Sequence, residues 1–185
     1  MDFVGNKPFP HLLIENFLDK QKAEKLLLAL KKEKFEEKDS DLFQFRQTKD
    51  LHFSKDKEIR EFVNMLESKE FSNRIKSITG INVKEGAFDL SGSLYIDTDY
   101  LLCHDDELEG RKIAYIYYLC EDFSEKDGGA LALLEDENGK PGKVSRRYFP
   151  KWNSLMIFEV SKKSWHEVEE VIGKKKRYAI GGWLH

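Results

Sequence analysis

The sequence has few of the features that mark membrane, secreted or nucleic-acid-binding proteins. Two cysteines, Cys103 and Cys120, are too few for a disulfide framework or a cysteine-based zinc site, and they indicate a reducing compartment. No apolar run approaches the roughly 20 residues of a membrane span, and the N-terminus lacks the layout of a signal peptide. With 31 Lys+Arg against 34 Asp+Glu, the net charge of −3 gives no general attraction to nucleic acid. We expect a cytoplasmic protein (or a nuclear one in a eukaryote) that is not secreted and has no membrane or direct nucleic-acid partner.

The chain does contain enough material for an ordinary folded domain. Its 185 residues are 40% hydrophobic and 12% aromatic, with 13 Phe. This composition is not that of a disordered protein, and the length suits one domain that builds its core without disulfides. No repeat or interdomain linker interrupts it. We therefore predict a single domain over residues 1–185.

The pattern of apolar residues changes near Gly80. Before it, the 3.6-residue period dominates, and residues 1–80 are predicted to form a helical support with N-terminal strands. Helices are predicted over 21–33, 56–71 and 72–80, and a strand or extended segment over 11–18 and 41–51.

After Gly80 the chain consists of short β-rich runs separated by polar turns, such as 137–145. Helices followed by a compact β unit predict an α+β fold that is mainly β, with residues 81–185 forming a sandwich or barrel. The predicted strands lie in 88–97, 100–106, 111–122, 128–136, 153–160, 164–172 and 176–184.

Three residues in the β-rich part are candidate metal ligands. His104 and Asp106 are two apart at the end of a predicted strand, so their side chains are expected on one face. His166, near the start of a later strand, is the candidate third ligand. Two histidines and one carboxylate form the facial triad of non-heme Fe(II) oxygenases, which leaves coordination positions open.

Arg177 is the candidate anion-binding residue. On the last predicted strand it shares a face with Ala179, Gly181 and Trp183, whose small members leave space for a ligand. The planar guanidinium binds a carboxylate in bidentate fashion, so a dicarboxylic acid fits between the metal and Arg177. Each residue also has a plainer interpretation: His104 as a solvated strand end, Asp106 as a turn residue, and Arg177 as one more cation of a basic hairpin turn.

Longer runs resemble a known family. The matching segments are HDD, RKIAYIYYLCEDF, DGGALALL, IFEV with SWHEV, and KRYAIGGW. They resemble the Fe(II)- and 2-oxoglutarate-dependent prolyl hydroxylases. Within that family, TDYLLCHDDELEGRKIA and DLFQFRQTKDL are most similar to the ribosomal prolyl hydroxylases, eukaryotic enzymes that hydroxylate a proline in a small-subunit decoding-centre protein.

The resemblance implies a fold and a set of site residues. The fold is a double-stranded β-helix, an eight-stranded barrel of the jelly-roll or cupin type, backed by the N-terminal helices. Three residues match the family's iron ligands: His104, Asp106 and His166. Four match positions around 2-oxoglutarate, as partners of its distal carboxylate or walls of its pocket: Arg177, Tyr118, Tyr95 and Trp183. In addition, Arg46 and Gln47 are candidates for contacting a substrate backbone.

The resemblance also implies an activity. The enzyme uses Fe(II), 2-oxoglutarate and O2, with ascorbate as a reductant, and hydroxylates a prolyl residue of a protein while releasing succinate and CO2. The implied partner is a proline-containing protein or peptide, a ribosomal small-subunit protein among them. The alternatives are an oxygenase acting on another side chain, a free amino acid or a small molecule, and a non-catalytic β-helix binding module. The relatives carry a second barrel, and since this chain ends two residues after Trp183, we expect only the catalytic barrel here.

Overall fold

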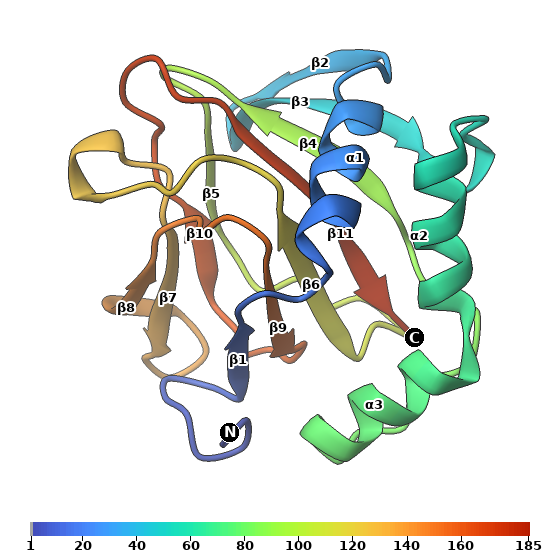
Figure 1. Cartoon of the computed structure of the whole chain (residues 1–185). Helices are drawn as coiled ribbons and strands as arrows, with labels where there is room; N and C mark the ends of the chain where they lie inside the picture. The colour runs from blue at the N-terminus through green and yellow to red at the C-terminus, as the bar shows by residue number, and fades with distance from the viewer. Residues whose placement is uncertain (1) are drawn as a thin grey trace.

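The first part of the chain supplies three helices, which lie together along one side of the molecule (Figure 1). The structure is a computed structural model that describes residues 2–185. The helices are α1 (Lys20–Leu30), α2 (Lys57–Glu67) and α3 (Lys69–Thr79). Along α2, a single face of Ile59, Phe62, Val63 and Leu66 is buried, as the 3.6-residue period predicts. None of the helices in the described residues is long and apolar enough to cross a membrane.

The boundary between the second and third helices differs from the prediction. The sequence predicted one helix over 56–71 and the next over 72–80, whereas α2 ends at Glu67 and α3 begins at Lys69. Ser68 interrupts the helical run with an extended backbone, and its hydroxyl accepts a hydrogen bond from the Phe71 amide at 3.1 Å. Ser68 is therefore an N-cap, which periodicity alone does not reveal. Gly80 ends α3 in the left-handed conformation, as predicted.

Eleven strands form one antiparallel sheet in the described part of the chain. Their order is β1-β9-β6-β11-β4-β3-β5-β10-β7-β8, with β2 paired to β3. The strands are β1 (His11–Ile14), β2 (Phe35–Ser40), β3 (Phe43–Asp50), β4 (Ser91–Tyr95), β5 (Tyr100–His104), β6 (Ile113–Tyr118), β7 (Leu131–Asp136), β8 (Pro141–Tyr148), β9 (Ser154–Glu159), β10 (His166–Val168) and β11 (Arg177–Leu184).

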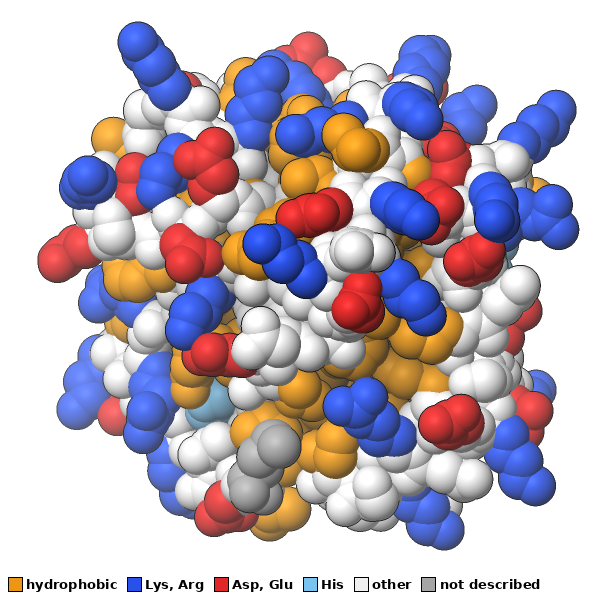
Figure 2. All heavy atoms as spheres, in the orientation of Figure 1, with side chains coloured by type: hydrophobic (Ala, Val, Ile, Leu, Met, Phe, Trp, Pro, Cys, Tyr) orange, Lys and Arg blue, Asp and Glu red, His pale blue; other side chains and the backbone are white. Residues whose placement is uncertain are grey.

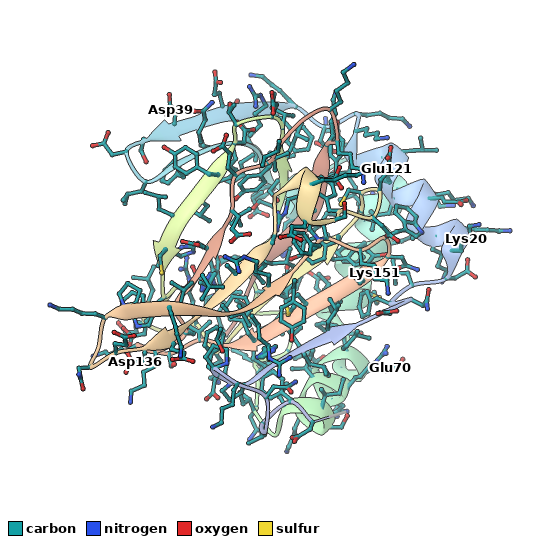
Figure 3. All side chains as sticks on the ribbon, turned by 90° about the vertical axis from the view of Figure 1, so that its left-hand side faces the viewer. Lys20, Asp39, Glu70, Glu121, Asp136 and Lys151 are labelled. Atoms are coloured by element: carbon teal, nitrogen blue, oxygen red, sulfur yellow. The ribbon has the colours of Figure 1, made fainter. Side chains whose placement is uncertain are left out.

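Two of these strands, β2 and β8, were not predicted. The segment over 137–145 was expected to be a turn, but it contains most of β8. Both strands are polar, mostly exposed and paired on one side only. They therefore lack the apolar face from which a strand is predicted in a sequence. In Figure 3, Asp39 on β2 and Asp136 at the end of β7 mark the outer ends of the two hairpins that these strands build.

The sheet curls so that distant strands face one another. Phe158 on β9 and His166 on β10 lie far apart in the strand order, yet their ring centroids are 4.6 Å apart. The result is a half-barrel, and the predicted mainly β, double-stranded β-helix backed by helices is confirmed. Figure 2 shows charges of both signs interspersed over the side of the molecule that Figure 1 presents.

Strand β6 separates two apolar cores. Tyr115 and Tyr117 belong to the core under the helices, whereas Ala114, Ile116 and Tyr118 face the core inside the curled sheet. Side chains along this strand therefore alternate between the two cores. One set of side chains packs in the core under the helices, and the other faces the interior of the curled sheet, where the candidate ligands lie.

Candidate metal centre and its cavity

His104, Asp106 and His166 converge inside the half-barrel. One ligand atom from each lies within 4.8 Å of the others. The Asp106 carboxylate bridges the two imidazoles, with Oδ1 at 3.4 Å from Nε2 of His104 and Oδ2 at 3.2 Å from Nε2 of His166. The two histidine rings are 4.2 Å apart. This is the arrangement that a single cation held on one face requires.

Paired strands bring the two histidines together. His104 is the last residue of β5 and His166 the first of β10, and the two are directly opposite in the antiparallel register. Asp106 reaches them differently from the prediction. Strand β5 ends before it, and Asp106 has a left-handed backbone with φ of 62°. A turn of the chain, and not strand alternation, points its carboxylate at the histidines.

Backbone carbonyls orient both imidazoles. Nδ1 of His104 donates to the Leu102 carbonyl at 2.8 Å, and Nδ1 of His166 donates to the Ser164 carbonyl at 2.7 Å. Because a carbonyl only accepts, the Nδ1 atoms carry hydrogen and the Nε2 atoms face the common point. Hydrogen bonds of this kind fix the tautomer and ring orientation of metal-binding histidines.

The carboxylate of Asp106 and the imidazole of His104 each favour the charged form of the other. Burial by itself would raise the pKa of Asp106, but hydrogen bonds from His104 and His166 outweigh it and hold that pKa far below its ordinary value. Burial opposes charge on His104 as well, yet the neighbouring carboxylate raises the pKa of His104 above its ordinary value. Asp106 is therefore an anion at neutral pH, as a cation ligand must be.

A cavity of about 150 Å³ extends from this cluster to Arg177. Arg177 is 1% exposed, so it is not the exposed cation of the plainer interpretation. Nε donates to the Gly129 carbonyl at 3.0 Å, and Nη2 lies 3.4 Å from the Tyr118 hydroxyl. No carboxylate within residues 2–185 forms an ion pair with it. A buried cation without an anion is costly, so its position favours an acidic ligand.

The remaining predicted pocket residues surround Arg177 or the cavity. The rings of Tyr95 and Tyr118 each lie 5.0 Å from the guanidinium carbon. Burial raises the pKa of both tyrosines, although the nearby Arg177 lowers it in part. They therefore stay protonated and can donate to a carboxylate. Trp183 lines the cavity, and its indole nitrogen is buried without a hydrogen-bond partner among the described residues.

Two residues near the cavity, Phe45 and Arg111, were missed by the sequence analysis, and a third, Gln47, was anticipated only in part. Phe45 stacks on Tyr95 with ring centroids 4.9 Å apart and also lines the cavity. The guanidinium of Arg111 lies 3.4 Å from the ring centroid of Trp183. Nothing in the sequence pattern signals that contact. Gln47, one of the two residues predicted to contact the substrate backbone, lines the cavity, as Phe45 does.

Arg46, the other candidate for a substrate contact, is already paired within the protein. Its guanidinium donates to the buried carboxylate of Asp99 at 2.9 Å and lies 3.3 Å from Glu37. Since both contacts are internal, the structure favours a structural role for Arg46.

Comparison with known proteins decides the family. Residues 90–185, which contain every candidate ligand, match the sequence profile described as "2OG-Fe(II) oxygenase superfamily". The chain belongs to this superfamily. The donor set fits the implied groups: two imidazoles and a carboxylate suit Fe(II), and a buried, unpaired guanidinium at the far end of the cavity suits an organic dianion.

Curated relatives are similar to almost the whole chain. Prolyl 3-hydroxylase OGFOD1 of Xenopus laevis is 41% identical over 98% of this chain, and prolyl 3,4-dihydroxylase OGFOD1 of Ostreococcus tauri is 34% identical over 98%. The alignments cover 36% and 39% of those proteins, so the chain spans about a third of the length of the curated relatives it matches.

Solved structures share the fold of this oxygenase. A prolyl-4-hydroxylase of Pseudomonas putida superposes with a TM-score of 0.76 at 16% identity, covering 95% of this chain and 91% of that one. A prolyl hydroxylase of Trichoplax adhaerens, in complex with a hypoxia inducible factor oxygen degradation domain peptide fragment, gives 0.73 at 20% identity, covering 94% and 82%. At these identities the likeness concerns the fold alone.

Proposed function

We propose that this oxygenase hydroxylates a prolyl residue in a protein, and that a ribosomal small-subunit protein is its substrate. The observation that carries the proposal is the convergence of His104, Asp106 and His166 beside the unpaired Arg177. The choice of proline rests on the curated relatives, which are named prolyl hydroxylases and align with 96–98% of the chain. The ribosomal substrate rests on the likeness of residues 98–114 to that group of enzymes.

The protein groups have distinct tasks in this proposal. His104, Asp106 and His166 hold Fe(II) on one face. When bound, iron and 2-oxoglutarate supply the oxidising chemistry, which couples decarboxylation to succinate with insertion of oxygen. Arg177 binds and orients the distal carboxylate of the cosubstrate, and the hydroxyl of Tyr118 adds a neutral donor beside it. Phe158, against the His166 ring, keeps that side of the cluster apolar and excludes water.

A groove beside the cavity supports a polypeptide substrate. It measures about 300 Å³ and shares Gln47, Ser91, Gly182 and Trp183 with the wall of the metal-side cavity. The groove is polar, and Arg111 in its wall donates to the carbonyl of the candidate ligand Asp106 at 3.3 Å. An extended segment lying in it brings one side chain toward the metal centre while its backbone stays outside.

The test is a hydroxylation assay under defined conditions. Purified protein receives Fe(II), 2-oxoglutarate and ascorbate, together with proline-containing peptides and intact proteins of the ribosomal small subunit. We expect succinate and a gain of one oxygen atom on a proline, read by mass spectrometry. The Asp106→Ala variant, which lacks one ligand, is the matched inactive control.

The outcomes separate the alternatives. Oxidation of proline in a non-ribosomal peptide alone would contradict the ribosomal substrate. Succinate released only with free amino acids or small molecules would contradict prolyl hydroxylation altogether. Protein that fails to bind Fe(II) under anaerobic, reducing conditions would favour the binding-module alternative.

A further inference from the structure

Asp106 is held in an unusual way for a metal ligand at a strand end. It lies in the loop of residues 105–112 that joins β5 to β6, and its φ of 62° falls in the left-handed region. Apart from glycine, mainly Asp and Asn adopt this conformation, because the β-carbon is crowded there. Such a backbone persists when surrounding contacts hold it in place. The contacts of this loop therefore decide where the carboxylate points.

Ser164 fastens the first part of the loop. It is fully buried, and its hydroxyl lies 2.8 Å from the Asp105 carbonyl, the peptide group that leads into Asp106. The hydroxyl is also 2.7 Å from the Ser161 carbonyl, which accepts the Ser164 amide at 3.0 Å as well. The hydroxyl therefore lies between two carbonyls and links the Ser161 turn to the peptide group that precedes Asp106. The carbonyl of Ser164 meanwhile accepts Nδ1–H of His166.

Arg111 fastens the last part of the loop. Its Nη1 donates to the Asp106 carbonyl at 3.3 Å and lies 3.9 Å from the Asp106 carboxylate. The same guanidinium rests on Trp183 at 3.4 Å from the ring centroid. This stack fixes the arginine against the cavity wall, since a planar guanidinium packs well on an aromatic face. Arg111 is itself a residue of the loop, and its stack on Trp183 anchors the side chain that holds Asp106.

We propose that Ser164 and Arg111 are positioning residues for Asp106. Neither side chain belongs to the candidate ligand set. Ser164 joins the backbone beside Asp106 to the backbone that orients His166, so one residue sets the relation between ligands 60 positions apart. Arg111 holds the left-handed residue itself. Together they keep the carboxylate aimed at the two imidazoles before any metal arrives, which reduces the reorganisation that binding requires.

The experiment measures metal affinity in the full chain without substrate or turnover. Mn(II), an oxygen-stable probe, is titrated into the wild type, Ser164→Ala and Arg111→Gln by electron paramagnetic resonance. Matched controls are Ser161→Ala, which removes a hydroxyl from the same turn, and Lys112→Gln, which changes the next side chain along. We expect the Mn(II) dissociation constant to rise roughly 10- to 100-fold in the first two variants, the range found when partners of metal ligands are removed. The controls should stay within about twofold of the wild type, a margin well below that range.

A second readout separates positioning from general destabilisation. The visible spectrum of bound Co(II) reports ligand geometry, and we expect it to change in Ser164→Ala and Arg111→Gln but not in the controls. Wild-type affinity and an unchanged Co(II) spectrum in both folded variants would overturn the proposal. If Ser164→Ala does not fold, Arg111→Gln at the partly exposed end of the loop decides. Failure of the wild type to bind Mn(II) would instead overturn the metal site on which this proposal rests.

Discussion

Arg177 makes the sharpest prediction, because its charge is buried before any ligand binds. Replacing it by methionine removes the cation but keeps most of the volume. The loss of a charged hydrogen bond to Gly129 costs about 2 kcal/mol, and the loss of two aromatic contacts costs about 1 kcal/mol each. Relief of the buried charge returns several kcal/mol. We expect Arg177→Met to change the ligand-free unfolding free energy by no more than about 2 kcal/mol.

The affinity for 2-oxoglutarate, in contrast to the stability, should fall strongly in Arg177→Met. Removing one partner of a buried charge pair costs about 2–5 kcal/mol, and a rise of about 100-fold in the dissociation constant, which corresponds to about 2.7 kcal/mol, lies in the lower half of that range. At a concentration of about 100 times the wild-type constant, ligand stabilises the wild type by about 2.7 kcal/mol but the variant by only about 0.4 kcal/mol. For a chain of this size, these values correspond to melting shifts of roughly 5–10 °C and roughly 1–2 °C.

Thermal unfolding of Mn(II)-loaded protein with and without 2-oxoglutarate is the assay. Lys176→Met, the exposed neighbour in the chain, is the matched control and should keep the full shift. A wild-type shift in Arg177→Met would refute the assignment of this residue to the distal carboxylate. A loss of more than about 3 kcal/mol in the ligand-free variant would refute the view that the guanidinium is an uncompensated buried charge.

Three further predictions concern other groups. Tyr118→Phe removes the hydroxyl beside Arg177, so 2-oxoglutarate binding should weaken by about 0.5–1.5 kcal/mol in calorimetry while Mn(II) binding stays unchanged; equal weakening of both would argue for a general structural defect. Hydrogen bonds from Ser124, aided by Lys175, lower the pKa of Asp127 to about 2 from 3.8. Since the folded pKa is the lower one, this stabilisation is present above about pH 4 and is lost as the pH falls toward 2. The stability advantage of the wild type over Asp127→Asn in urea unfolding should vanish over that interval, and an advantage that persists at pH 2 would contradict the assignment. Burial raises the pKa of Cys103 to about 11 and of Cys120 to about 12, so iodoacetamide should label both slowly at pH 8 until the protein unfolds; rapid labelling of folded protein would contradict this.

The sequence predicted the interior strands well because burial leaves a pattern in them. Along β6 and β11, alternate residues face different cores, and Arg177 lies on the cavity-facing side of β11 together with Gly181 and Trp183, as predicted. Strands β2 and β8 left no such pattern, since they lie at edges and bury little. The N-cap at Ser68 was not predicted for another reason. The residues around Ser68 have a helical pattern, and only the extended backbone of Ser68 interrupts the helix.

The candidate site was predictable in its members but not in its geometry. Strand parity placed His104 and Asp106 side by side, yet their proximity arises from a left-handed loop residue. The stack of Arg111 on Trp183 and the bridge from Ser164 to the loop join segments about 60–70 residues apart. Contacts of this kind depend on how the sheet curls, and a single sequence carries no periodic signal for them.

Because strand β6 contributes side chains to two cores, substitutions along it fall into two groups with different effects. Tyr117 packs toward the helices and away from the cavity wall, so substitutions around it change global stability without reshaping the pocket. Ala114 lines the cavity and the Tyr118 hydroxyl lies beside Arg177, so substitutions there change the pocket. Effects at well-separated sites add. A stabilising repack of the helical side can therefore compensate for a costly change in the pocket, and this gives the scaffold room to acquire a new substrate while it stays folded.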